Sequence, residues 1–135
     1  MMKRTAADVA LIFVDHINSH DLASLVNLMT EDVVFIDGLG NEIRGIYPIK
    51  RAWQAYFSNF PDYSIEVDES FSQGNVAGLF GYAHGTYFAD GKLSVENRWR
   101  IPAAWKAVIK NGLVAKWRVY ANNEPVWKLM RVKRY

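Results

Sequence analysis

The sequence contains no cysteine, and this absence excludes several kinds of chemistry. Without a thiol the chain forms no disulfide, carries no thiolate nucleophile and offers no sulfur ligand to a metal ion. It also lacks any apolar run near the roughly 20 residues that a membrane-spanning helix needs. The opening Met-Met-Lys-Arg is not followed by the apolar segment and cleavage site of a signal peptide. We therefore expect a soluble, cytoplasmic protein with no membrane partner.

The sequence also has little excess of one charge over the other. The net charge of +2 is too small to indicate a nucleic-acid partner, which normally meets a strongly basic surface. The basic residues near the C-terminus are Lys128, Arg131, Lys133 and Arg134. We interpret them as a solvated tail, because no aromatic platform is interleaved with a long basic stripe.

Apolar and aromatic residues, in contrast, are abundant. Half of the 135 residues are hydrophobic and 14% are aromatic, which is enough for one core and for the walls of a pocket. The sequence shows no internal repeat, no low-complexity stretch and no interdomain linker. We expect one domain that spans residues 1–135.

The N-terminal part of the chain has the signals of helices. Thr5, followed three residues later by Asp8, predicts the start of one helix, and Asp21 can cap a second. A run of strand-forming residues at 33–37 then leads into a glycine-rich loop. Pro48 is favourable as the first residue of a third helix.

Beyond residue 62 the period of the apolar residues changes to two, the period of a strand. Strands are predicted at residues 63–72, 76–88, 93–109 and 113–121. Asp90-Gly91 and Asn111-Gly112 are strong hairpin-turn signals. Helices come first and a meander of antiparallel strands follows, which predicts an α+β fold.

This order of elements resembles the nuclear transport factor 2-like superfamily, whose enzyme branches include the SnoaL-like polyketide cyclases, ketosteroid isomerase and limonene epoxide hydrolase. The best local matches are residues 16–22 (His-Ile-Asn-Ser-His-Asp-Leu), residues 31–45 and residues 111–120. The resemblance covers nearly the whole chain. It implies a cone in which N-terminal helices pack on a curved, mainly antiparallel sheet.

The resemblance also assigns catalytic positions, and this chain keeps only part of them. Asp37 matches the general base of the isomerase branch, which moves a proton between carbons near a carbonyl. The positions of the partner acids hold Phe13, Trp105 and Val119 instead. Because the loss of one oxyanion donor typically costs about 100- to 1,000-fold in rate, the resemblance argues against steroid isomerase activity. It also argues against epoxide hydrolase activity, because the Asp-Arg-Asp set of that branch falls on the apolar residues Ala103, Trp105 and Val119.

Asp37 and His84 are the candidate catalytic residues. The resemblance places Tyr82, His84 and Thr86 inside the cone, where the imidazole could share a proton with the Asp37 carboxylate near pH 7. Two other interpretations stay open. Asp37 could accept hydrogen bonds from its own turn, and His84 would lie outside the cone if the small residues that alternate with it, such as Ala83, faced inward.

The expected walls of the pocket are almost all aromatic. They are Phe13, Trp53, Tyr56, Phe57, Phe60, Tyr82, Trp99, Trp105, Trp117 and Val119. So many large side chains could line an open pocket or fill it completely. His16 and His20 have a spacing that can bind zinc, but the usual glutamate between them is absent, and a histidine near a helix C-terminus is favoured by the dipole alone. We expect neither a metal nor another cofactor.

Two functions follow from these residues. The first is a cofactor-independent enzyme of the isomerase, cyclase or dehydratase type, with Asp37 as general base and an apolar, oxygen-bearing substrate. The alternative is a noncatalytic domain of the same fold, which binds an apolar ligand or serves as a dimeric interaction module. The resemblance further implies a homodimer that associates through the sheet.

Overall fold

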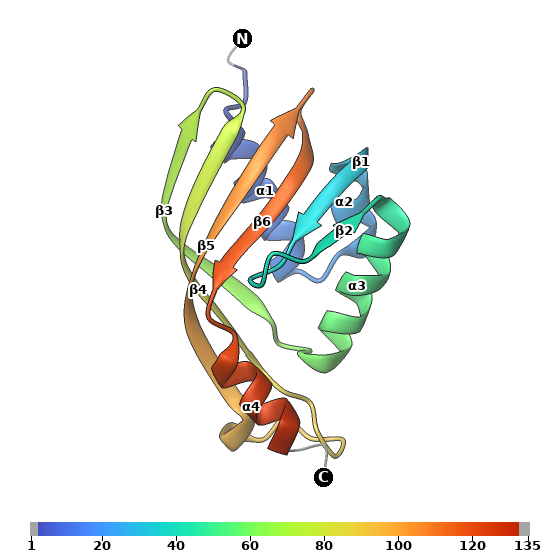
Figure 1. The fold of residues 1–135 in the computed structure, drawn as a ribbon, viewed down its shortest axis with the longest axis vertical. Coiled ribbons are helices and arrows are strands. Elements are labelled where there is room, and N and C mark those ends of the chain that lie inside the picture. The colour runs from blue at the N-terminus through green and yellow to red at the C-terminus, as the bar shows by residue number, and fades with distance from the viewer. Residues whose placement is uncertain (1–2, 133–135) are drawn as a thin grey trace.

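The protein consists of a six-stranded sheet with helices packed against it (Figure 1). This arrangement confirms the predicted α+β class. The computed structural model describes residues 3–132. In chain order the elements are α1 (Ala6–Asn18), α2 (Leu22–Asn27), β1 (Met29–Ile36), β2 (Glu42–Arg44), α3 (Ile46–Asn59), β3 (Ser64–Gln73), β4 (Val76–Thr86), a short 3-10 helix (Val95–Asn97), β5 (Arg98–Lys110), β6 (Leu113–Ala121) and α4 (Glu124–Val132).

The strands lie in the order β2-β1-β6-β5-β4-β3, and all neighbours are antiparallel except β1 and β6, which are parallel. The sheet is strongly curved (Figure 1). Helix α1 packs against β3, β4, β5 and β6, whereas α3 packs against β1 and β2. One face of the sheet, which we call the inner face, therefore meets the helices; the opposite, outer face does not.

Local signals explain how the helices begin. The Thr5 hydroxyl accepts a hydrogen bond from the Asp8 backbone N–H at 3.1 Å, and the Thr5 N–H donates to the Asp8 carboxylate at 2.9 Å. This is the predicted capping box. The buried residues of α1 recur at helical spacing: Ala6, Val9, Ala10, Phe13, Val14 and Ile17. Asp21 caps α2 as predicted.

The two strongest turn signals are also confirmed as turns. Asp90 and Gly91 have φ angles of 54° and 69°, and Asn111 and Gly112 have φ angles of 53° and 76°. Two successive left-handed residues are what a two-residue hairpin turn of the I′ type requires. After the first turn, however, no long strand begins until Arg98, so the strand predicted from residue 93 starts too early.

The C-terminal prediction is confirmed for exposure but wrong for secondary structure, which matters for the site. Lys128 and Arg131 are exposed, as expected, but they belong to helix α4 rather than to a tail. Lys133 and Arg134 lie outside the described residues. Val126 is buried in the core, and α4 lies at the end of the molecule away from the N-terminus, near the connection between β4 and β5 (Figure 1). Among the described helices, none combines the length and apolar character needed to cross a membrane.

Candidate functional site

Aromatic rings occupy much of the space between the helices and the inner face of the sheet. Phe13 on α1 and Trp117 on β6 are fully buried, and their ring centroids are 4.8 Å apart. Trp105 is also buried in the core, and Val119, its register partner on β6, is half-buried. The three positions at which relatives were expected to carry acids are therefore part of the apolar packing.

A second group of rings joins α3 to the sheet. It contains Trp53, Tyr56, Phe57, Phe60, Tyr63 and Trp99, with neighbouring centroids 4.8–6.3 Å apart. All but Tyr56 are buried; Tyr56 is half-buried. These rings pack against one another, so in this region the predicted pocket walls are largely core.

The predicted orientation of β4 is wrong. Ala83 and Gly85 are buried on the inner face, whereas Tyr82 and His84 are half-buried on the outer face. A Cβ atom on Gly85 would lie 3.3 Å from the indole of Trp99, so the small residues make room for the aromatic core. His84 does not form the proposed acid–base pair with Asp37. It lies on the outer face of β4, whereas Asp37 follows β1, and strands β6 and β5 lie between the two in the sheet.

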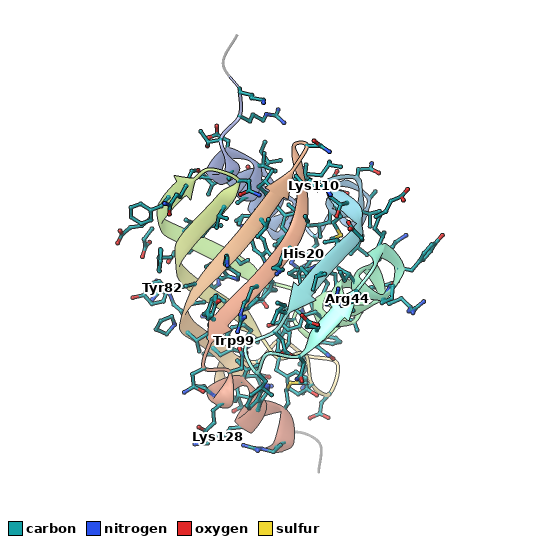
Figure 2. All side chains as sticks on the ribbon, turned by 45° about the horizontal axis from the view of Figure 1, so that its top comes forward. His20, Arg44, Tyr82, Trp99, Lys110 and Lys128 are labelled. Atoms are coloured by element: carbon teal, nitrogen blue, oxygen red, sulfur yellow. The ribbon has the colours of Figure 1, made fainter. Side chains whose placement is uncertain are left out.

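Tyr82 makes its contacts on the outer face as well, and Figure 2 shows it at the side of the sheet. The Arg100 guanidinium lies 3.6 Å from the centroid of the Tyr82 ring and forms an ion pair with Glu66 at 2.7 Å. The hydrogen bond that the Arg100 guanidinium donates to the Glu66 carboxylate is the main reason that the pKa of Arg100 is raised. These contacts give Tyr82 a role on the sheet surface rather than in a pocket.

Asp37 is exposed and organises its own turn. Its Oδ1 accepts hydrogen bonds from the backbone N–H groups of Leu39 and Asn41, both at 2.9 Å, and its Oδ2 accepts one from the Asn41 side-chain amide at 3.2 Å. The turn therefore uses most of the acceptor capacity of this carboxylate. This geometry matches the alternative in which Asp37 is a turn residue.

The same turn nevertheless borders a cleft of about 300 Å³ at the end of the molecule where α4 lies. We call it the mouth cleft. Its lining residues are Asp37, Gly38, Leu39, Tyr56, Asn59, Phe60, Asn123, Val126, Trp127 and Met130. Three segments far apart in sequence thus meet there: the turn after β1, the end of α3 and helix α4.

The phenols next to the mouth cleft are unusual. Burial raises the pKa of Tyr56, and it raises the pKa of Tyr63 as well, with a further contribution from the neighbouring Tyr56. Both side chains are therefore neutral near pH 7. Their rings meet edge to face, with centroids 4.8 Å apart. Tyr56 is the one that lines the cleft.

Sequence reasoning identified Asp37, Tyr56 and Phe60 as site residues but missed the side of the cleft formed by α4. The signal was available: Val126, Leu129 and Met130 are spaced i, i+3, i+4, which is typical of a helix with one apolar face. The basic residues in the same segment favoured a tail, so the helix that this spacing indicates was not predicted.

With the fold and the cleft described, the comparisons with known proteins give the family. The model of the SnoaL-like domain family matches residues 11–117, which is more than half of the chain. The protein therefore belongs to the SnoaL-like domain family, as the resemblance implied.

Solved structures agree on the fold. A candidate SnoaL-like polyketide cyclase from Shewanella denitrificans OS-217 superposes with a TM-score of 0.80 at 15% identity, covering 94% of this chain and 97% of that one. A hypothetical protein with a ketosteroid isomerase-like fold from Catenulispora acidiphila DSM 44928, solved with trimethylamine, gives 0.77 at 11% identity, with 90% and 91% covered. An epoxide hydrolase from M. tuberculosis gives 0.76 at 12% identity, with 96% and 91% covered. At these identities the likeness shows the fold alone.

One curated protein also matches in sequence. The class 1 fructose-1,6-bisphosphatase of Rhodopseudomonas palustris (strain BisB5) is 41% identical over 64 residues. Those residues make up 47% of this chain, and the chain spans about a fifth (19%) of the length of that protein. The match is too short to assign a family.

Proposed function

We propose that the protein binds a small apolar molecule in the mouth cleft. The observation that carries this proposal is the cleft itself, which has about 300 Å³ of space and apolar walls supplied by Phe60, Val126 and Met130. Binding sites for small molecules typically have this size and this mixture of apolar walls and few polar groups. The polar side chains of the lining are those of Asp37, Tyr56, Asn59 and Asn123.

The packing of the interior favours binding over catalysis. The positions at which the superfamily carries partner acids are filled by Phe13 and Trp105, both buried. His84 is on the outer face, and the Asp37 carboxylate is engaged by three donors of its own turn. A binding site needs none of these groups for chemistry, because it requires only a shaped, partly apolar surface.

A titration with 1-tetralone, a neutral bicyclic ketone, tests this proposal. The fluorescence of Trp127, which lines the cleft, is expected to change saturably as the ketone binds. Met130→Glu places a carboxylate in the wall and is expected to weaken binding at least about tenfold, because burying an unpaired charge is costly. Arg131→Glu, an exposed neighbour that is not part of the wall, is the matched control. Equal binding by both variants would contradict the proposal.

A second candidate is a proton-transfer enzyme with Asp37 as general base. The specific observation in its favour is that Asp37 borders the same cleft as the apolar walls, and Oδ2 retains acceptor capacity beyond its one bond to Asn41. Asp37→Asn should then abolish turnover of a panel of ketones and epoxides while the fold is kept. Equal turnover by the variant and the parent would remove Asp37 from any mechanism.

We also propose a homodimer that associates through the outer face of the sheet. Phe71 and Phe80 are exposed on that face, with ring centroids 6.0 Å apart. Glu69 lies on β3 and Arg118 lies on β6, and their side chains carry opposite charges. If two copies are related by a two-fold axis parallel to the strands, Glu69 of one copy would lie near Arg118 of the other. Light scattering should give a dimeric mass for the parent and a monomeric mass for Phe80→Lys. A monomeric parent would contradict this assembly.

A further inference from the structure

The ring group behind the mouth cleft contains hydrogen-bond donors without partners. The Nε1–H groups of Trp53 and Trp99 are buried and meet no acceptor within the described residues. The hydroxyls of Tyr56 and Tyr63 also make no hydrogen bond within residues 3–132, but neither oxygen is fully buried. Burial of the rings is the main cause of the raised pKa of both phenols. Since native interiors rarely leave buried polar groups unpaired, the two indole N–H groups call for an explanation. The two hydroxyls, which are not fully buried, remain available to a partner outside the chain.

These four donors belong to one set of touching rings. Trp53 lies 6.1 Å from Tyr56, Tyr56 lies 4.8 Å from Tyr63, and Tyr63 lies 6.0 Å from Trp99, measured between ring centroids. Tyr56 is the only one of the four that lines the mouth cleft, and it is half-buried where the other three are buried. It is therefore the donor that a molecule in the cleft can reach first.

The chemistry of Tyr56 and its surroundings limits what that molecule can be. A neutral phenol at the wall of the cleft offers one O–H donor, and such a donor favours an oxygen acceptor. Asp37 borders the same cleft, and within residues 3–132 its carboxylate forms no ion pair, so an anionic ligand would meet a negative charge. A neutral oxygen satisfies the donor without that repulsion.

We propose that the Tyr56 hydroxyl is the specificity-determining group of the mouth cleft and that it recognises a neutral carbonyl oxygen on an otherwise apolar ligand. This inference rests on the proposed binding function, since it names the group that reads the ligand. Tyr63, whose ring packs against that of Tyr56 and which does not line the cleft, acts as a positioning residue.

The test compares two probes of the same carbon skeleton, 1-tetralone and tetralin, which differ in the carbonyl group. The parent protein should bind tetralone about three- to tenfold more tightly, the range expected for one neutral hydrogen bond. Tyr56→Phe removes one oxygen atom and should bind both probes equally, at the tetralin affinity of the parent. Tyr47→Phe, an exposed tyrosine outside the mouth cleft, should behave as the parent does.

An infrared difference spectrum separates recognition from a merely structural effect. A hydrogen bond to the carbonyl lowers its stretching frequency, so bound tetralone should show a lowered frequency in the parent and in Tyr47→Phe but not in Tyr56→Phe. If the parent binds both probes equally, or if Tyr56→Phe keeps the preference for tetralone, the inference is overturned while the binding function stands. If the parent binds neither probe, both the inference and the proposed function fail.

Discussion

The imidazole of His20 lies flat on the ring of Phe57, with centroids 4.0 Å apart and planes inclined by 11°. The Nε2–H of the same imidazole donates a hydrogen bond to the backbone carbonyl of Tyr63 at 2.8 Å. His20 has a φ angle of 54°, the left-handed conformation that ends α1. One side chain thus ties the end of α1 to α3 and to the start of β3, beside the aromatic group.

This relationship predicts a structural role for His20. His20→Ala should lower the free energy of unfolding by about 1–3 kcal/mol, because it removes both a stacked ring and a hydrogen bond that satisfies a carbonyl. His16→Ala, one turn earlier and without a hydrogen bond from its imidazole in the described structure, should change stability by about 0.5 kcal/mol or less. Urea denaturation of the two variants measures the difference, and equal effects would contradict the role.

A second prediction concerns the filled interior. Phe13→Ala should cost about 3–5 kcal/mol of stability, because it removes a fully buried ring in contact with Trp117 and leaves a cavity. Tyr47→Ala, at a tyrosine that is 75% exposed, is the control and should be nearly neutral. A small effect of Phe13→Ala in chemical denaturation would mean that the cone has room that the described packing does not show.

The close approach between the turn after β1 and the segment before α4 gives a third prediction. A Cβ atom on Gly38 would lie 2.9 Å from the Ala121 carbonyl oxygen and 3.1 Å from the Asn123 side-chain nitrogen. Gly38→Ala should therefore displace the backbone on one side of the mouth cleft and cost about 1–3 kcal/mol.

The control for this prediction is Gly78→Ala. Its added methyl group would meet the nearest atom, on Phe80, at an ordinary 3.6 Å. Thermal unfolding of both variants, together with tetralone titration, should show loss of stability and weaker binding for Gly38→Ala alone. If Gly38→Ala matches the parent in both measurements, the two segments are not packed as closely as described.

The pH dependence of stability gives a fourth prediction. The pKa of Asp21 is lowered from its usual 3.8, first by the Ser24 hydroxyl and then by the Ser24 backbone N–H. The Asp21 carboxylate takes up a proton more readily in the unfolded chain than in the folded protein. Its contribution to the free energy of unfolding is therefore fully present above about pH 4, and it is lost as the pH falls through the lower pKa of the folded state.

Asp21→Asn isolates that contribution. Asparagine can still cap α2 but does not titrate. As the pH is lowered from 5 to below the folded pKa of Asp21, the free energy of unfolding should therefore fall less for the variant than for the parent. Asp15→Asn, which changes an exposed carboxylate that caps no helix, should follow the parent. The measurement is the free energy of unfolding as a function of pH, and identical curves for parent and Asp21→Asn would refute the assignment.

The parts of the fold that sequence could predict depend on short-range signals. Thr5 with Asp8, and Asn111 with Gly112, specify their helix start and hairpin turn by contacts within a few residues. Trp99 and Trp105, two of the expected pocket walls, do face inward, and they alternate with exposed residues along β5. In each case the deciding interaction is local, so no knowledge of distant segments is needed.

The orientation of β4 and the position of α4 could not be predicted in this way. Either alternating set of β4 could face inward by composition, and what decides is the bulk of Trp99 and Phe60, which need the space beside Gly85. The mouth cleft likewise exists because α4 meets the turn at Asp37 and the end of α3. Both outcomes depend on long-range packing that a single sequence does not encode in its spacing.

The most direct test of the central claim is the response of backbone amide signals in NMR to 1-tetralone. Binding in the mouth cleft should shift the amides of Gly38, Leu39, Asn59, Asn123 and Trp127 in a saturable manner, with one common affinity. The amides of residues 70–73, at the end of β3 that lies away from α4 (Figure 1), should stay in place. Shifts confined to those amides, or no saturable shift at all, would contradict the account that this cleft is the functional site.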